Sequence, residues 1–174
     1  MPSETNAQRT LFTLLGIPWK LTPTSFQFIP SRLATGLLLA FIFLRSETLG
    51  MKFMIGVVYA LILLASQFLH IIGHILGGKA VGHPMSASLI IAYQFTTYYA
   101  DEPPDLPRRV HLTRTIGGPL MNFIIATLAY IAWQIYDGHV LLFTTLINLF
   151  LSSMLFLPIK GIDGEIFWRE IRRS

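Results

Sequence analysis

Two histidines, His70 and His74, stand four residues apart in the apolar stretch from Phe68 to Gly78. On a helix this spacing places both imidazoles on one face, one turn apart. Polar groups in apolar surroundings are costly and tend to mark function, so the pair indicates a metal or cofactor site. Zinc hydrolases carry a glutamate directly after the first histidine of such a pair. Here that position is Ile71, so the pair offers ligands without the usual base beside them.

The composition is that of a membrane protein. The 174 residues are 53% hydrophobic and 13% charged, with a mean hydropathy of +0.59, whereas a soluble domain carries about 25% charged residues. There is no cysteine, which excludes disulfides, thiolate metal ligands and a thiolate nucleophile. The net charge of +4 does not indicate nucleic-acid binding, because the basic residues flank the apolar segments and form no single patch.

Four apolar segments are candidates for transmembrane helices. We expect spans at about 31–49, 53–78, 116–136 and 139–157, within a membrane domain that covers residues 31–168. The first span is the shortest, and Arg32 and Arg45 can snorkel outward from its ends. The second carries the histidines together with Gly73 and Gly77, a small-xxx-small pair that lets another helix approach closely.

The segments outside the spans are expected to be short. Residues 1–30 are predicted to form an N-terminal arm and connector, with an amphipathic helix over 3–17 that either lies on the membrane surface or packs on the protein itself. The arm has no convincing cleavage site, so we expect the mature chain to start at or near Met1. Between spans two and three, residues 86–99 are rich in Ile, Tyr, Phe and Thr and predict a strand or hairpin. Residues 169–174 form a basic tail.

The basic residues set the expected orientation. With four spans, the N-terminus, the 79–114 loop and the C-terminal tail share one side, which carries eleven of the thirteen Lys and Arg residues. The other side has only Arg45 and Lys52. By the positive-inside rule both termini are predicted to be cytoplasmic.

This topology brings distant polar residues to one membrane level, at the cytoplasmic face: His70, His74, Asn122 and Asp163. Two imidazoles and one carboxylate leave a fourth position open, which is the arrangement of a catalytic zinc, and a shell of nitrogen and oxygen suits Zn²⁺. Three simpler interpretations stay open. The two histidines also suit a neutral pair that is hydrogen-bonded within the bundle. Asp163 with Gly164 is also typical of an ordinary turn, and Asn122 is as well suited to bridging helices.

Three motifs, in order along the chain, resemble the site-2 protease family of intramembrane zinc metalloproteases. They are His70-Ile-Ile-Gly-His74, Gly118-Pro-Leu-Met-Asn122 and Leu157-Pro-Ile-Lys-Gly-Ile-Asp163-Gly164. The resemblance covers about residues 53–168 and implies a three-helix core. It also implies zinc ligation by His70, His74 and Asp163, a substrate or oxyanion contact at Asn122, and strands near 86–99 that pair with an extended substrate.

The chain departs from the family pattern at the base. Ile71 takes the place of the glutamate that serves as general base, and the loss of such a group costs about 10²- to 10⁴-fold in rate. Leu155 replaces an asparagine, and Glu165 replaces a glycine after the aspartate. Glu165 would act as the base only if its carboxylate came within hydrogen-bond reach of the bound water.

We therefore expect an all-α polytopic membrane protein with about four transmembrane helices, a site-2-protease-like core and a short strand or hairpin between spans two and three. The leading hypothesis is a pseudoprotease, with no catalytic residue at Ile71, that retains Zn²⁺ and binds a membrane protein as a regulator or as a subunit of a complex. One alternative is an active intramembrane metalloendopeptidase with an atypical base. Another is a pigment- or haem-associated subunit of an electron-transfer complex, with a histidine as axial ligand. We expect it in a prokaryotic plasma membrane.

Overall fold

The computed structural model describes residues 9–100, 103 and 105–173. Within these residues four helices are long and apolar enough to cross a membrane, which confirms the four-span prediction. They are α1 (Phe28–Phe43, after the short 3-10 turn Ser25–Gln27), α2 (Leu49–Ala80), α3 (Arg108–Tyr136) and α4 (His139–Ser153, extended by the 3-10 turn Met154–Phe156). A shorter helix, α5 (Asp163–Arg172), follows them.

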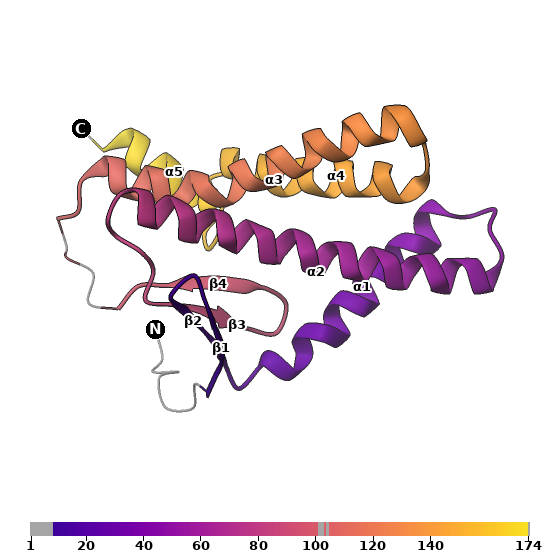
Figure 1. The fold of residues 1–174 in the computed structure, drawn as a ribbon, viewed down its shortest axis with the longest axis horizontal. Coiled ribbons are helices and arrows are strands. Elements are labelled where there is room, and N and C mark those ends of the chain that lie inside the picture. Colours follow the sequence, from indigo (N-terminus) through magenta and orange to yellow (C-terminus); the bar gives the residue numbers. More distant parts are fainter. Residues whose placement is uncertain (1–8, 101–102, 104, 174) are drawn as a thin grey trace.

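Helix α2 runs the length of the molecule, with α3 and α4 along one side and a small sheet along the other (Figure 1). Its start is capped by Thr48, whose hydroxyl accepts a hydrogen bond from the Met51 N–H at 3.3 Å. At 32 residues it is about 48 Å long, well beyond the roughly 30 Å of a bilayer core. The histidines lie in its last third, so they sit toward one end of the bundle.

Glycines set how closely the long helices pack. A Cβ on Gly36 of α1 would collide with the backbone of Gly56 and Ala60 on α2. A Cβ on Gly73 of α2 would collide in the same way with the carbonyl of Gly117 on α3. Helices in lipid gain little from burying apolar surface, so such backbone contacts supply much of their association. These two contacts place α1 and α3 on α2.

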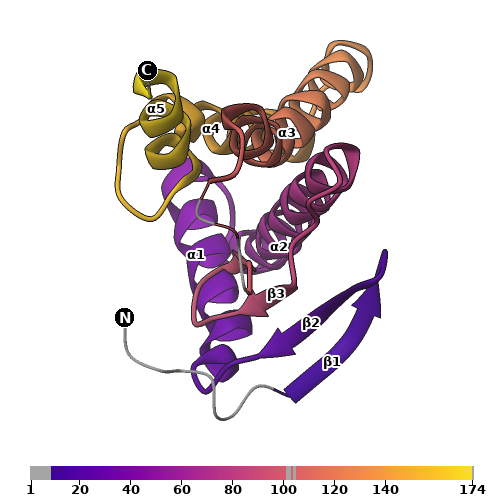
Figure 2. The ribbon, with the colours of Figure 1, turned by 90° about the vertical axis from the view of Figure 1, so that its left-hand side faces the viewer.

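The four strands form one sheet in the order β1-β2-β3-β4. They are β1 (Arg9–Leu14), β2 (Ile17–Leu21), β3 (Ala87–Ile90) and β4 (Phe95–Tyr98). Strands β2 and β3 are parallel, and the two outer pairs are antiparallel hairpins. The predicted strand or hairpin within 86–99 is confirmed as β3 and β4, and the view in Figure 2 shows the β1–β2 hairpin extending from it.

The helix predicted over residues 3–17 is wrong for residues 9–17, and residues 3–8 lie outside the described residues. The chain reverses instead at Leu15 and Gly16, which both have positive φ (53° and 75°), the conformation of a two-residue hairpin turn. Beyond the turn, Ile17 and Trp19 alternate with more exposed neighbours, a period of two. The connector expected from 18 to 30 is accordingly part strand and part helix.

Trp19 joins the sheet to the bundle. It is fully buried, with its ring 5.3 Å from Phe12, 5.0 Å from Phe68 and 5.1 Å from Phe95 between centroids. It shares one hydrophobic cluster with Ile71 of α2. The sheet is therefore packed directly against the turn of α2 that carries the two histidines.

The basic tail predicted at 169–174 is largely helical, since residues 169–172 form the last turn of α5. The last residue, 174, lies outside the described part of the chain. Glu170 in this turn is 2% exposed, and its carboxylate accepts a hydrogen bond from the neighbouring Arg169 Nε at 3.0 Å. Helix α5 packs against α3, with Asp163 as its first residue.

Candidate metal centre

His70 and His74 project from one face of α2 toward the first residue of α5. The two Nε2 atoms are 3.0 Å apart, and they lie 3.1 Å (His70) and 3.4 Å (His74) from the two carboxylate oxygens of Asp163. All three potential ligand atoms lie within 4.8 Å of one another. Residues separated by 93 positions in the chain thus converge on one point, as the sequence predicted.

The proton positions of both rings follow from their other partners. His74 Nδ1 lies 2.7 Å from the backbone carbonyl of Arg114, which can only accept, so this nitrogen carries the hydrogen. His70 Nδ1 lies 2.9 Å from the side-chain oxygen of Asn122. The amide orientation of Asn122 decides whether that nitrogen is also a donor.

A chain of hydrogen bonds fixes this orientation. Asn148 Nδ2 donates to the Thr144 carbonyl at 2.9 Å, so the oxygen of Asn148 faces the other way. That oxygen accepts from Asn122 Nδ2 at 3.1 Å, which leaves the oxygen of Asn122 for His70. Both imidazoles therefore carry hydrogen on Nδ1, and both present an Nε2 lone pair toward Asp163.

Three electron-rich atoms, two imidazole nitrogens and a carboxylate, thus face one another at 3.0–3.4 Å. Such a cluster needs positive charge, which a metal ion between the three atoms or a proton on one Nε2 would supply. Imidazoles oriented through Nδ1 by an amide or a carbonyl are the usual supporting arrangement of metal-ligating histidines. The residues present therefore fit a zinc ion, with the fourth coordination position left to a water or another ligand.

The polar network also contains residues that the sequence interpretation missed. Asn148 is fully buried on α4, and its Nδ2 also donates to Ser66 Oγ of α2 at 2.9 Å. Asn122 is equally buried, and it connects the histidines to these two residues. The sequence could have indicated Asn148 and Ser66, because both are uncharged polar residues inside apolar spans, where polar residues tend to mark function.

Gly118 makes room for the metal position. A Cβ at this residue would lie 2.6 Å from His70 Nε2 and closer still to His74 Nε2. The contact between Gly73 and Gly117 one residue earlier holds this part of α3 against α2. The glycines of the Gly118-to-Asn122 motif thus allow the α3 backbone to lie beside the ligand nitrogens.

The loop before α5 delivers Asp163 to the histidines. Gly161 has a φ of +87°, and its N–H donates to the carboxylate of Glu165 at 2.7 Å. Gly164 is buried so close to the carbonyl of Leu157 that a Cβ would collide with it. Burial would by itself raise the pKa of Asp163, but a proton taken up by the imidazoles opposite holds that pKa well below its usual range.

Ile71 occupies the position between the two ligands where zinc hydrolases carry their base. It is 3% exposed and belongs to the cluster of Ile17, Trp19, Ile75 and Met85. It also lines the same cavity, of about 340 Å³, as the two histidines and Asp163. Within the described residues, no further carboxylate joins the ligand cluster.

Strand β4 also lines the cavity. Gln94 and residues 95–97 of β4 line it together with Gly161, Ile162 and Asp163 at the start of α5. Strand β4 is the last in the sheet order, so its outer edge has no strand partner in the described part of the chain. An open sheet edge of this kind can pair with an extended peptide.

Together, the four spans, the sheet beside the second of them and the ligand geometry define a site-2-protease-like membrane protein. The chain is similar to the solved structure of the Site-2 Protease from Methanocaldococcus jannaschii, with a TM-score of 0.66 and 25% sequence identity over 95% of this chain and 71% of that one. No family model matches the sequence, and no curated protein does. The resemblance inferred from the three motifs is confirmed at the level of the fold.

Proposed function

We propose that this protein is a catalytically impaired relative of the site-2 proteases that retains a zinc site and binds a segment of another membrane protein. The observation that carries this proposal is the environment of Ile71. An apolar side chain, packed into the core shared by α2 and the sheet, stands where proton transfer to and from the bound water would need a carboxylate. When bound, zinc would polarise a carbonyl or a water in the open position.

The parts that would hold a partner remain. Strand β4 offers a free edge along the cavity, and Asn122 is held rigidly between His70 and Asn148. An extended segment paired with β4 would lie between the sheet and the loop before α5, close to the ligand atoms. Binding of this kind needs the β4 edge and the ligand cluster but no general base. The chain has both of these features.

Two variants at one position test the loss of chemistry. Ile71→Glu restores a carboxylate. Ile71→Gln is the matched control, because the glutamine side chain has the shape of glutamate but cannot act as a base at neutral pH. We expect zinc in the wild type and cleavage of a tagged transmembrane reporter only in Ile71→Glu. Robust cleavage by the wild type that disappears in Asp163→Ala would contradict the proposal, and so would a wild type that binds no zinc.

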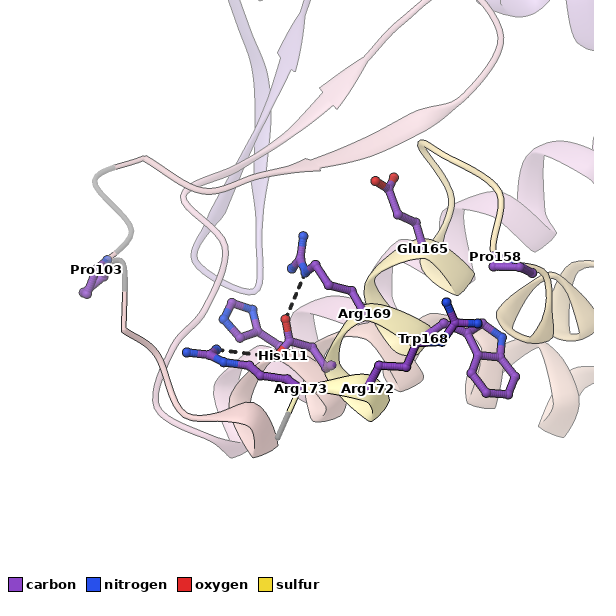
Figure 3. A pocket seen from close by; sticks show the side chains of 9 residues that line it. Pro103, His111, Pro158, Glu165, Trp168, Arg169, Arg172 and Arg173 are labelled. Atoms are coloured by element: carbon purple, nitrogen blue, oxygen red, sulfur yellow. Dashed lines mark hydrogen bonds and ion pairs between the residues drawn. The ribbon is translucent and has the colours of Figure 1, made fainter.

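One observation favours a second candidate, an active protease with an atypical base. Glu165 lines the same cavity as the ligands and extends from the first turn of α5 toward the sheet (Figure 3). Its carboxylate is, however, already an acceptor for the Gly161 N–H at 2.7 Å. Glu165→Gln separates the two candidates, since an active enzyme would lose its cleavage and a pseudoprotease would keep its partner.

The third alternative, a pigment- or haem-bearing subunit, has less in its favour. An axial ligand needs an open apolar space in front of its nitrogen, whereas both Nε2 atoms here face a carboxylate within 3.4 Å. An absorption spectrum of the purified protein tests it: a coloured protein that bleaches in His70→Ala or His74→Ala would favour the pigment over zinc.

A further inference from the structure

A second cavity, of about 860 Å³, lies between α5 and the first turn of α3, and it shares Glu165 but none of the three ligand residues with the cavity at the metal centre (Figure 3). We call it the α5 cleft. Its polar and aromatic lining comprises His111, Glu165, Trp168, Arg169, Glu170, Arg172 and Arg173. Neither the three sequence motifs nor the proposed function assigns this cleft a role.

The guanidinium groups of the α5 cleft are oriented by neighbouring side chains, yet they remain partly exposed to solvent. Buried Glu170 accepts from Arg169 Nε at 3.0 Å and lies 3.6 Å from a terminal nitrogen of Arg173. The side chains of these two arginines are still 59% and 46% exposed. Arg172 lies over the ring of Trp168, 5.8 Å from its centroid. An oriented guanidinium with open N–H groups is a suitable donor to phosphate oxygens.

The α5 cleft lies at the depth of the lipid headgroups. The stretch of α3 from Thr115 to Tyr136 has no charged residue and is about 33 Å long, which matches the thickness of a bilayer core. His111 stands one turn outside Arg114, at the start of this stretch. The cleft that His111 lines is therefore a few Å beyond the hydrocarbon, where the phosphates of a membrane lie.

Apolar and aromatic groups beside the α5 cleft agree with this depth. Trp168 donates through Nε1 to the carbonyl of Phe156 at 2.9 Å, and its amphipathic ring is of the type found at membrane interfaces. The side chains of Phe156 (63%) and Ile159 (53%) are exposed next to it. A surface with arginines at one level and apolar side chains beside them suits a phospholipid, with its headgroup and its acyl chains.

We propose that the α5 cleft binds the phosphate headgroup of an anionic phospholipid, through Arg169 and Arg172. The nearby carboxylates do not cancel the charge, because three arginines face two glutamates, Glu165 and Glu170. Each basic residue at a membrane surface strengthens the binding of anionic lipid about fivefold. This inference does not depend on metal binding or on catalysis at the other site.

Native mass spectrometry of the full chain in detergent tests the proposal, with titration of phosphatidylglycerol and of phosphatidylcholine. We expect the wild type to prefer phosphatidylglycerol, and the double variant Arg169→Gln/Arg172→Gln to lose about 25-fold in affinity for that lipid alone. The matched control is Arg45→Gln/Lys52→Gln, which removes the same charge from the opposite end of the bundle and should keep the preference.

A further double variant distinguishes loss of charge from misfolding. Arg169→Lys/Arg172→Lys keeps the charge and should keep most of the preference, and circular dichroism reports whether each variant is folded. Equal binding of the two lipids by the wild type would overturn the proposal. So would an equal loss in the control variant, or displacement of phosphatidylglycerol by millimolar inorganic phosphate, which would assign the cleft to free phosphate.

Discussion

Asp163 is the residue that completes the metal centre, and its removal gives the first prediction. Asp163→Ala takes away the only carboxylate of the described ligand cluster, and we expect zinc affinity to fall at least about 100-fold, more than is typical for loss of a supporting residue. Elemental analysis after dialysis against a competing chelator measures this. Asp105→Ala, at an exposed position in the loop before α3, is the control and should retain its zinc.

Gly118 gives a second prediction. It binds no metal itself, but its missing side chain leaves room beside the two Nε2 atoms. Gly118→Ala would put a methyl group against both Nε2 atoms, and we expect the protein to insert in the membrane but to bind about 100-fold less zinc. Gly50→Ala is the matched control, since a Cβ at Gly50 meets nothing within 4 Å. Normal zinc content in Gly118→Ala would show that the metal does not sit between the two imidazoles.

Residue types and spacing predicted that His70, His74 and Asp163 come together, and the structure shows this, whereas their role as metal ligands stays a prediction. His70, His74 and Asp163 carry ligand chemistry in their side chains, and the topology already brought them to one level. The partners behind them were harder to predict. Asn148 and Ser66 face the centre only because α4 and α2 are rotated in a particular way, and the Arg114 carbonyl belongs to the backbone, so no residue type could have indicated it.

Among the elements, the contact between α2 and α3 is the one most sensitive to substitution. Gly73→Ala would force the two backbones apart at Gly117, and we expect an unfolding midpoint lower by several degrees together with weaker zinc binding. Circular dichroism at increasing temperature, in the same detergent, measures the shift. Gly50→Ala on the same helix provides the comparison, and an equal shift in both variants would mean that general helix propensity causes it.

Strand β4 carries the prediction about the partner. A photo-crosslinking amino acid in place of Thr97, which lines the cavity, should give one discrete product with a bound membrane protein. The same amino acid in place of Thr127, on an exposed face of α3, should give none. Crosslinks of equal strength from both positions would contradict pairing at β4.

The elements were predictable where one period dominated the sequence. Long apolar runs predicted the spans, and residues 86–99 predicted β3 and β4. The N-terminal hairpin was not predictable in the same way, because Leu11, Leu14 and Leu15 also fit one side of a helix. The decisive feature was the turn at Leu15, a residue that rarely takes positive φ and gives no hairpin signal of its own.

For the whole molecule, the basic residues predict which side faces the cytoplasm. In a four-span topology eleven of the thirteen belong to the side of the N-terminus, the 79–114 loop and the C-terminal segment, so we expect that side to be cytoplasmic. The natural chain has no cysteine, so single cysteines can be introduced without background. In intact cells, a membrane-impermeant maleimide should label Ser46→Cys and should leave Lys160→Cys unlabelled until the cells are opened. The reverse pattern would contradict this orientation.

The glycine contact between α2 and α3 limits how a partner segment can reach the ligand atoms. Backbone lies against backbone along this seam, so nothing can reach the ligand atoms through it. The cavity lined by β4 and the start of α5 does reach the ligand residues. Its β4 edge pairs with an extended segment and not with a helix, so a partner segment bound there would have to unwind first. Under the proposed function, partners would be selected by how readily their helices unwind.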